Sequence, residues 1–340
     1  MVNALKYLLL FILSVVLLAV MVVFQGPQHL FALATGGWGR LPGETALIDV
    51  TENCAGQAAC ESGLIRVLTF NVLCRVCTES DRKPGYEPWY VRLPYLREII
   101  RYYEPDLIGF QETGGSQDLE ELNPDSERFA WLAFREGGLL YGDAALLYRR
   151  DRFELLDSGQ FWLNPNFRLP FGFGWKPLSM PRYVNWARLR NRENGFEFLF
   201  LNTHFDNNSP NKEPSAVFVH DVMRVPALHL PIIMTGDFNT QGDTQRYQNL
   251  VRGRDPEPLL KEAAELAAVR ELVPPAYPDE SVAPAEPDLF LRQIDHIFLG
   301  GPGTWEVTRW AVDTRAGGSA KNIQPSDHPA VFAEVRCVLR

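Results

Sequence analysis

The sequence contains little cysteine and little histidine, with 5 and 6 residues of each type among 340. They are too few and too scattered for a structural zinc site, which needs a cluster of such ligands. The cysteines instead stand in two close pairs, Cys54 with Cys60 and Cys74 with Cys77, while Cys337 stands alone. Close pairs favour disulfides and therefore an exported domain. Small buried thiols beside a strand are the alternative for Cys74 and Cys77.

Basic residues are also scarce, with 33 Lys and Arg against 42 Asp and Glu. The first 35 residues carry one basic residue, Lys6, and no acidic one, so the remainder has 32 basic and 42 acidic residues and a charge of −10. Duplex DNA binding depends on a dense phosphate-neutralising surface, so this balance argues mildly against a nucleic-acid substrate, although a local basic patch would escape it. The chain is 46% hydrophobic and 12% aromatic, which excludes global disorder.

One long hydrophobic run is present, Tyr7–Phe24, with a single polar interruption. Its length reaches the minimum for a membrane-spanning helix and is long for the core of a signal peptide. We therefore predict an uncleaved membrane anchor within residues 1–27. A cleaved signal is the alternative, because an Ala-Leu-Ala site follows at 32–34. Lys6 precedes the run, so the positive-inside rule places the short head in the cytoplasm and the remainder outside.

From residue 64 onward, apolar runs and helical spacing predict alternating strands and helices. Ile65–Asn71 and Asp106–Glu112 are typical of buried strands, and Trp89–Tyr103 has apolar residues at helical spacing. This order implies a βα unit whose polar strand ends lie side by side. Further strands are predicted at 129–134, 144–149, 153–156, 183–190, 294–299 and 330–338, an amphipathic helix at 257–272, and loops at 113–128, 161–181, 205–216 and 273–291.

Two apolar runs in the middle of the chain, Phe198–Leu201 and Ile232–Met234, end abruptly in polar residues. Side chains just past the carboxyl ends of buried strands lie on a rigid platform beside a cleft. Histidine with acid and amide groups suits a divalent cation and a phosphate, although ordinary turn chemistry at two hairpin ends would also place such residues there. The residues concerned are Asn202, His204 and Asp206 after the first run, and Asp237 and Asn239 after the second.

Five separate segments deliver polar groups beside predicted strands, which makes coincidence a poor explanation. Glu112 suits magnesium, which takes oxygen ligands and is often held by one or two carboxylates together with substrate phosphate. His328 is a candidate base toward water, with Asp295 to orient it. His204 and Asn239 can donate hydrogen bonds to the charge that develops on phosphorus. Together the segments predict a metal-assisted site for phosphoester chemistry.

Six segments, in this order, resemble the successive signatures of the endonuclease/exonuclease/phosphatase superfamily. The resemblance implies a four-layer α/β sandwich, in which two packed mixed β-sheets are flanked by helices. It also implies magnesium-dependent hydrolysis of phosphoesters by in-line attack of water, with manganese as an alternative metal. The segments are Thr69–Leu73 (TFNVL), Gly109–Thr113 (GFQET), Asn202–Asp206 (NTHFD), Gly236–Thr240 (GDFNT), Ile294–Phe298 (IDHIF) and Ser326–Pro329 (SDHP).

The resemblance further implies roles for individual residues. Residues 181–189 are similar to a Pro-Arg…Trp-Ala segment of many bacterial members, which nominates Arg182 as a phosphate contact; a solvated charge at a strand edge is the alternative. Members differ in whether the residue at Asp237 or at His328 activates water. His296 stands where some nucleases carry tyrosine, so we interpret it as strand packing. The implied metal residues are Asn71, Glu112 and Asp327, the phosphate contacts are Arg182, Asn202, His204 and Asn239, and the catalytic residues are His204, Asp237, Asn239, Asp295 and His328.

The sequence thus predicts an anchor or signal at 1–27, a tether and covering segment at 28–62, and a catalytic domain at 63–340. The expected activity is hydrolysis of phosphodiester or phosphomonoester bonds outside the cytoplasm, at the membrane or, if the signal is cleaved, as a secreted protein. The acidic charge, the anchor and the aromatic segment 161–181 favour a lipid headgroup or soluble ester over nucleic acid. An extracellular nuclease acting on DNA or RNA, or a catalytically silent tethered binding module, is the alternative. No obligate protein partner is evident.

Overall fold

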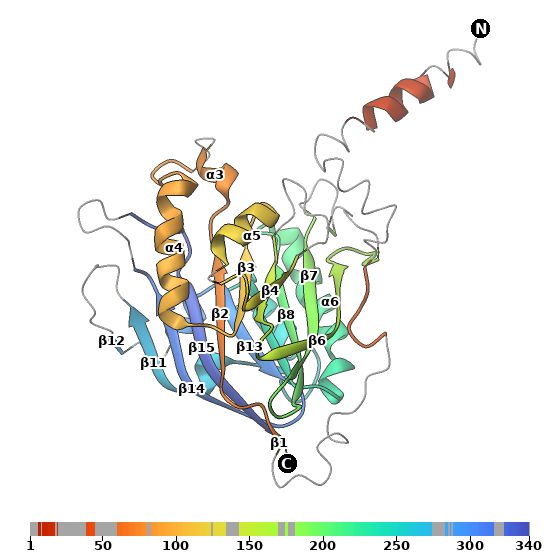
Figure 1. The fold of residues 1–340 in the computed structure, drawn as a ribbon. Helices are drawn as coiled ribbons and strands as arrows, with labels where there is room; N and C mark the ends of the chain where they lie inside the picture. The colour runs from red at the N-terminus through yellow and green to blue at the C-terminus, as the bar shows by residue number, and fades with distance from the viewer. Residues whose placement is uncertain are drawn as a thin grey trace.

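In the computed structural model, two β-sheets pack face to face and carry helices on their outer faces (Figure 1). Much of the predicted tether and of the loops 161–181 and 273–291 lies outside the described residues. The described residues are 6–7, 9–17, 19, 39–44, 60–79, 83–123, 125–133, 143–168, 174–175, 181–273, 283–284, 286, 288–315 and 323–339.

Within these residues, one sheet has nine strands and the other has six. The larger sheet runs β12 (Ala283–Pro284), β11 (Ala267–Val273), β14 (Thr304–Asp313), β15 (Ala330–Leu339), β2 (Ile65–Asn71), β3 (Leu107–Gln111), β5 (Leu146–Arg149) and β4 (Phe129–Leu132), with β1 (Cys60–Glu61) beside β15. The smaller sheet runs β10 (Leu260–Glu262), β13 (Asp295–Gly300), β9 (Ile232–Asp237), β8 (Glu197–His204), β7 (Tyr183–Asn191) and β6 (Phe153–Trp162).

Helices cover the outer face of each sheet. The larger sheet carries α4 (Trp89–Tyr103) and α5 (Ser116–Leu122), and the smaller sheet carries α6 (Ser209–Met223) and α7 (Gln245–Val251). This order of helix, sheet, sheet and helix confirms the predicted fold class. The shorter helical segments are α3 (Arg75–Glu79), α8 (Ala263–Leu266), α9 (Leu289–Arg292) and the 3₁₀ turn η1 (Pro226–Leu228).

Strand β2 explains why the central strands read as continuous apolar runs. Its residues Ile65 and Val67 enter the core between the sheets, whereas Leu68 and Phe70 enter the core under α4. Successive side chains of a strand point to opposite faces, so a strand that is covered on both faces must be apolar at every position. Arg66 and Thr69 are exceptions to this rule within the strand, and the last residue, Asn71, lies at the edge where the polar residues gather.

Three expectations about secondary structure were wrong. Residues 257–272 do not form one helix, because they pass through β10, the single turn α8 and β11. Leu260 packs under α7, whereas Ala263 faces the core between the sheets, so the apolar spacing serves two different cores. The loops expected at 113–128 and 205–216 contain α5 and the first turns of α6.

The predicted membrane segment Tyr7–Phe24 is described only in part. Residues 9–17 are helical and their side chains are exposed, while residues 20–24 lie outside the described part of the chain. Among the described residues, no helix is both long enough and apolar enough to cross a membrane.

Candidate active site

The strand pairing gathers the polar strand ends at one edge of the sandwich. β2 and β3 run parallel and pair Asn71 with Gln111. β8 and β9 also run parallel and pair His204 with Asp237, while β13 runs antiparallel to β9 and pairs Asp295 with Asp237. Carboxyl ends of parallel strands share an edge, which is where open α/β sheets place their ligands.

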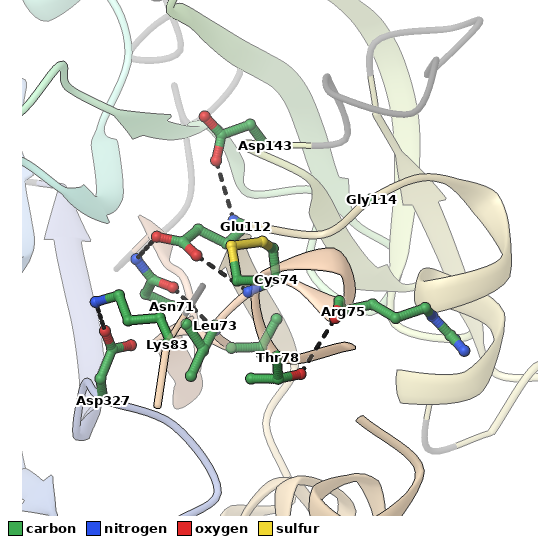
Figure 2. Close-up of a disulfide and its surroundings, with 12 residues drawn as sticks. Asn71, Leu73, Cys74, Arg75, Thr78, Lys83, Glu112, Gly114, Asp143 and Asp327 are labelled. Atoms are coloured by element: carbon green, nitrogen blue, oxygen red, sulfur yellow. Dashed lines mark hydrogen bonds and ion pairs between the residues drawn. A yellow bond between two sulfur atoms is a disulfide. The ribbon is translucent and has the colours of Figure 1, made fainter. Parts of the chain in front are cut away.

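Asn71 joins the two sheets at this edge. Its Nδ2 donates to Glu112 Oε1 at 3.1 Å and to Asp237 Oδ2 at 3.1 Å, and its Oδ1 accepts from the backbone N–H of Leu73 at 3.1 Å. The other oxygen of Glu112 accepts from the backbone N–H of Cys74 at 3.0 Å (Figure 2). The amide therefore holds two acidic side chains from different sheets near each other.

His328 forms one half of the site together with Asp295. Its Nδ1 lies 2.8 Å from Asp295 Oδ2, and its Nε2 lies 3.8 Å from Asp237 Oδ2. Burial on its own would lower the pKa of His328, but the charges of Asp295, Asp237 and Asp327 outweigh it and raise the pKa to about 10. His328 therefore carries a proton at neutral pH.

His204 forms the other half together with Asp143 and Arg182. Its Nδ1 lies 2.7 Å from Asp143 Oδ1 and 2.9 Å from Arg182 Nη1, and its Nε2 lies 3.3 Å from Asp237 Oδ2. Arg182 is also ion-paired to Asp143. Burial and then the positive charge of Arg182 lower the pKa of His204 to about 4, so this imidazole is neutral at neutral pH.

Asp143 is a site residue that the sequence reasoning missed. Besides its contacts with His204 and Arg182, it accepts the backbone N–H of Glu112 at Oδ1, at 3.0 Å, and its own N–H donates to the hydroxyl of Tyr183 at 3.1 Å. Its only sequence signal is an acid that directly precedes a predicted strand, and Asp143 lies in none of the six signature segments. Asp143 ties the phosphate side of the site to Glu112.

Two site residues have a backbone conformation that is uncommon outside glycine. Glu112 has φ 62° and Asn239 has φ 48°, in the left-handed region. Such residues cost on the order of 1–3 kcal/mol and persist where the surroundings fix them, often at functional sites. Asn239 is fixed by donating its N–H to Asp237 Oδ1 at 2.8 Å and its Nδ2 to the carbonyl of Phe205 at 2.9 Å.

Asn202 does not join the predicted phosphate contacts. Its Nδ2 donates to the carbonyls of Phe110 and Ala145, and its Oδ1 accepts from Gln111 and Thr235. An amide has two donor hydrogens and two acceptor lone pairs, so this fully buried side chain has none left for a phosphate. Its position between β8 and the larger sheet indicates that it fastens the two sheets together.

Two other polar residues near the edge also have structural partners. Asp206 accepts from the N–H of Asn208 at 2.9 Å and from Asn211 Nδ2 at 2.6 Å, so it supports the start of α6. His296 is buried, with Nδ1 2.8 Å from Glu262 and Nε2 2.9 Å from the carbonyl of Thr240. This position agrees with the interpretation of His296 as strand packing.

Buried Arg92 cross-links the loops that carry the site, and it too was missed. Its guanidinium donates to the carbonyls of Val72 and Leu73, which follow Asn71, and to that of Pro325, which precedes the Asp327–His328 pair. Burial lowers the pKa of Arg92 to about 10, so it still carries its charge at neutral pH. In the sequence it occurs within a helix, where an arginine normally indicates a solvent-exposed face.

The donor set fits a hard divalent cation. Oδ1 of Asp295 and Oδ1 of Asp327 are buried oxygen atoms that accept no hydrogen bond in the described part of the chain. Ligand atoms of Asp237, Asp295 and His328 lie within 4.8 Å of one another, but a protonated His328 offers no lone pair. Magnesium prefers oxygen ligands, which Asp237 and Asp295 offer in this group and which Glu112 and Asp327 offer as further acids of the site.

Comparisons with known proteins agree with this geometry. The model of the endonuclease/exonuclease/phosphatase family matches residues 68–328. A family protein of Bacteroides thetaiotaomicron is 26% identical, with 82% of this chain and 98% of that chain covered and a TM-score of 0.64. A mannosyl-6-phosphatase of the same organism is also 26% identical, covering 80% and 99%, with a TM-score of 0.63.

A more distant structure shares the fold alone. The human Nocturnin catalytic domain with a bound sulfate anion is 17% identical, with 80% of this chain and 93% of that chain covered and a TM-score of 0.55. A search of curated protein sequences finds none that matches this chain.

Proposed function

The chain belongs to the endonuclease/exonuclease/phosphatase family and is therefore a phosphoester hydrolase, and we propose that it uses a bound magnesium ion to hydrolyse its substrate by in-line attack of water. The observation that carries this proposal is the approach of two histidines to one acid. His204 and His328 reach Asp237 from different strands, at 3.3 and 3.8 Å. A phosphoryl group beside this acid would meet one neutral and one charged imidazole.

We assign the magnesium ion to Glu112 and Asp327, with Asn71 beside them. The partnerless oxygen of Asp327 and the left-handed backbone that presents Glu112 support this assignment. Magnesium bound here would polarise a phosphoryl oxygen and offset the charge of the transition state. Manganese, which takes similar ligands, is the alternative.

We assign the handling of the attacking water to the pair formed by Asp237 and His328. With the proton of the pair held on His328, we assign the carboxylate of Asp237 as the acceptor for the proton of water. Its two oxygens accept one hydrogen bond each from Asn71 and Asn239, which leaves further lone pairs. Asp295 fixes the ring of His328 through Nδ1. His204, Asn239 and Arg182 are assigned to the phosphoryl oxygens, where hydrogen-bond donors stabilise developing charge.

We propose a phosphomonoester or phosphodiester of small size, or a lipid headgroup, as the substrate. The mannosyl-6-phosphatase is similar over nearly the whole domain, which supports a sugar phosphate as one member of this class. The charge of −10 after residue 35 supports a substrate other than nucleic acid.

We propose that the catalytic domain is exported and anchored by Tyr7–Phe24. The Cys74–Cys77 disulfide supports export, because such bonds persist in oxidising compartments. Fractionation of cells that express the full chain, followed by protease treatment of intact cells, tests both parts. Recovery in the soluble cytoplasmic fraction would contradict them.

The activity is tested with the chain from about Gly36 onward and the full chain in parallel. The substrates are mannose 6-phosphate, inositol phosphates, sphingomyelin vesicles, duplex DNA, RNA and a chromogenic phosphodiester, each with magnesium and with chelator. Metal-dependent turnover of one class identifies the substrate. No turnover on any of them by the folded protein would refute the proposal and favour a tethered binding module.

A further inference from the structure

Lys83 forms an ion pair with Asp327, one of the two acids that we assign to the metal. Lys83 Nζ lies 2.6 Å from Asp327 Oδ2 (Figure 2). The side chain of Lys83 is 50% exposed, whereas that of Asp327 is 15% exposed, so the ammonium lies on the open side of the carboxylate. An ammonium has three donor hydrogens, and this contact uses one of them.

One backbone hydrogen bond joins Lys83 to a disulfide-bonded turn. Cys74 and Cys77 form a disulfide, and the N–H of Cys77 donates to the carbonyl of Cys74 at 3.0 Å. The N–H of Lys83 donates to the carbonyl of Cys77 at 3.1 Å. A constrained segment loses less conformational freedom when its side chain binds a ligand. The backbone N–H of Lys83 is thus tied to this turn.

The same segment touches both acids assigned to the metal. At one end the N–H of Cys74 donates to Glu112, and at the other the ammonium of Lys83 contacts Asp327 (Figure 2). A solvent-facing ion pair that served stability alone would contribute little. A metal cation bound at Oδ1 of Asp327 would neutralise part of the carboxylate charge. Lys83 would then be paired less strongly with Asp327 and could donate to a substrate in the site.

We propose that Lys83 is a phosphate-binding residue of this site and that it favours dianionic phosphomonoesters over monoanionic phosphodiesters. The inference rests on the proposed function and narrows its substrate class. On the His204 side the charge of Arg182 is matched by Asp143. The ammonium of Lys83 is paired with Asp327, so a metal ion on that acid would leave the ammonium available to the substrate. A positive charge attracts a dianion more strongly than a monoanion at the same distance.

The test compares Lys83→Met and Lys83→Arg with the wild type, and Lys261→Met serves as the matched control because Lys261 is exposed on β10. Calorimetric titration measures the affinity for magnesium, and then for inorganic phosphate in the presence of magnesium. We expect Lys83→Met to weaken phosphate binding about tenfold, which a charged hydrogen bond accounts for. Lys83→Arg should stay within about threefold of the wild type, and Lys261→Met should match it.

Turnover gives a second readout. For Lys83→Met, kcat/KM on p-nitrophenyl phosphate should fall about tenfold, and on bis(p-nitrophenyl) phosphate by about threefold or less. Magnesium affinity should stay unchanged or increase, because a neighbouring ammonium has been removed.

Several results would overturn the assignment. Tighter magnesium binding with unchanged phosphate binding would make Lys83 a competitor of the metal only, and unchanged binding of both would make the ion pair a surface contact. Equal losses on monoester and diester would remove the selectivity. A wild type that binds no phosphate in the presence of magnesium would also refute it. Since the titration requires no turnover, a wild type that binds phosphate but hydrolyses no ester contradicts the proposed function alone.

Discussion

The two histidines of the site have similar neighbours but opposite charge. Nδ1 of His204 lies 2.7 Å from Asp143, and Nδ1 of His328 lies 2.8 Å from Asp295. Both rings turn Nε2 toward Asp237. Yet burial lowers the pKa of the first to about 4, whereas the acids around the second overcome burial and raise its pKa to about 10.

His204 is the more deeply buried of the two rings, and it also has a permanent cation beside it. Arg182 pairs with Asp143 and contacts the ring of His204, so it matches the charge of the acid and repels a proton from the ring. Within the described residues, His328 and Asp295 form no hydrogen bond or ion pair with an arginine or lysine, and Lys83 pairs with Asp327 instead. A carboxylate beside a histidine therefore does not by itself fix the charge of the ring.

Removal of the shared acid should have the largest effect, because both histidines approach Asp237. We expect Asp237→Asn to lower kcat by about 10³-fold, within the range seen for the loss of general acid–base groups. The pKa of His328 should also fall, since Asp237 contributes to its elevation. Steady-state kinetics measure kcat, NMR titration measures the pKa of His328, and circular dichroism checks that the variant is folded. Asp221→Asn on the exposed face of α6 is the control. A loss of less than tenfold would remove Asp237 from the centre of the site.

Replacement of Arg182 tests the cause of the contrast directly. In Arg182→Gln, His204 keeps its burial and Asp143 but loses the neighbouring positive charge, so its pKa should rise from about 4 toward the ordinary value. We expect kcat to fall about 10²-fold, because an oxyanion donor is lost as well. NMR titration of the histidine rings, assigned with His204→Gln, gives the pKa. If it stays near 4, burial alone sets the charge of His204.

The sequence predicts the centre of the fold well, because both faces of the central strands are covered. A short continuous apolar run such as Phe198–Leu201 is typical of a buried strand, and all four of its residues are buried in β8. The prediction fails at residues 257–272, where helical spacing is produced by β10, α8 and β11 together. Leu260 and Ala263 enter different cores, and the strands that pair with β10 and β11, which are β13 and β14, come later in the chain.

The sequence predicts those site residues that lie beside the ends of the predicted strands. Asp237 and His328 follow or precede apolar runs, so local pattern finds them. Asp143, Arg92 and Lys83 acquire their roles from partners 19 to 244 residues away, which no local pattern encodes. Asn202 was wrongly predicted as a phosphate contact because it lies in a signature segment. Its side-chain amide is instead fully hydrogen-bonded to groups that join the two sheets.

The two histidines should also respond in opposite ways to pH in the stability of the protein. For His328 the folded pKa of about 10 is above the ordinary 6.5, so its stabilisation is present in full below about 6.5 and is lost as pH rises toward 10. For His204 the folded pKa of about 4 lies below 6.5, so its stabilisation is present above about 6.5 and is lost as pH falls toward 4.

Urea unfolding of His328→Gln and His204→Gln across pH measures these opposite trends. We expect His328→Gln to cost about 2 kcal/mol more at pH 6 than at pH 10, and His204→Gln to cost about 2 kcal/mol more at pH 7 than at pH 4. Parallel pH profiles of the two variants would show that the rings carry the same charge, and the contrast between the two halves would then be lost.

Removal of the Cys74–Cys77 disulfide should have the smallest effect. This variant tests whether the Glu112 side of the site and the His204 side are independent of each other. Cys74→Ser with Cys77→Ser should lower the free energy of unfolding by at most about 2 kcal/mol, because the bond closes a very short loop. Magnesium affinity should fall about threefold, since the N–H of Cys74 holds Glu112 less firmly. The pKa of His204 should stay near 4 in the NMR titration. Glu112 also donates its N–H to Asp143, so a shifted pKa of His204 would mean that the metal side and the phosphate side adjust together through this one residue.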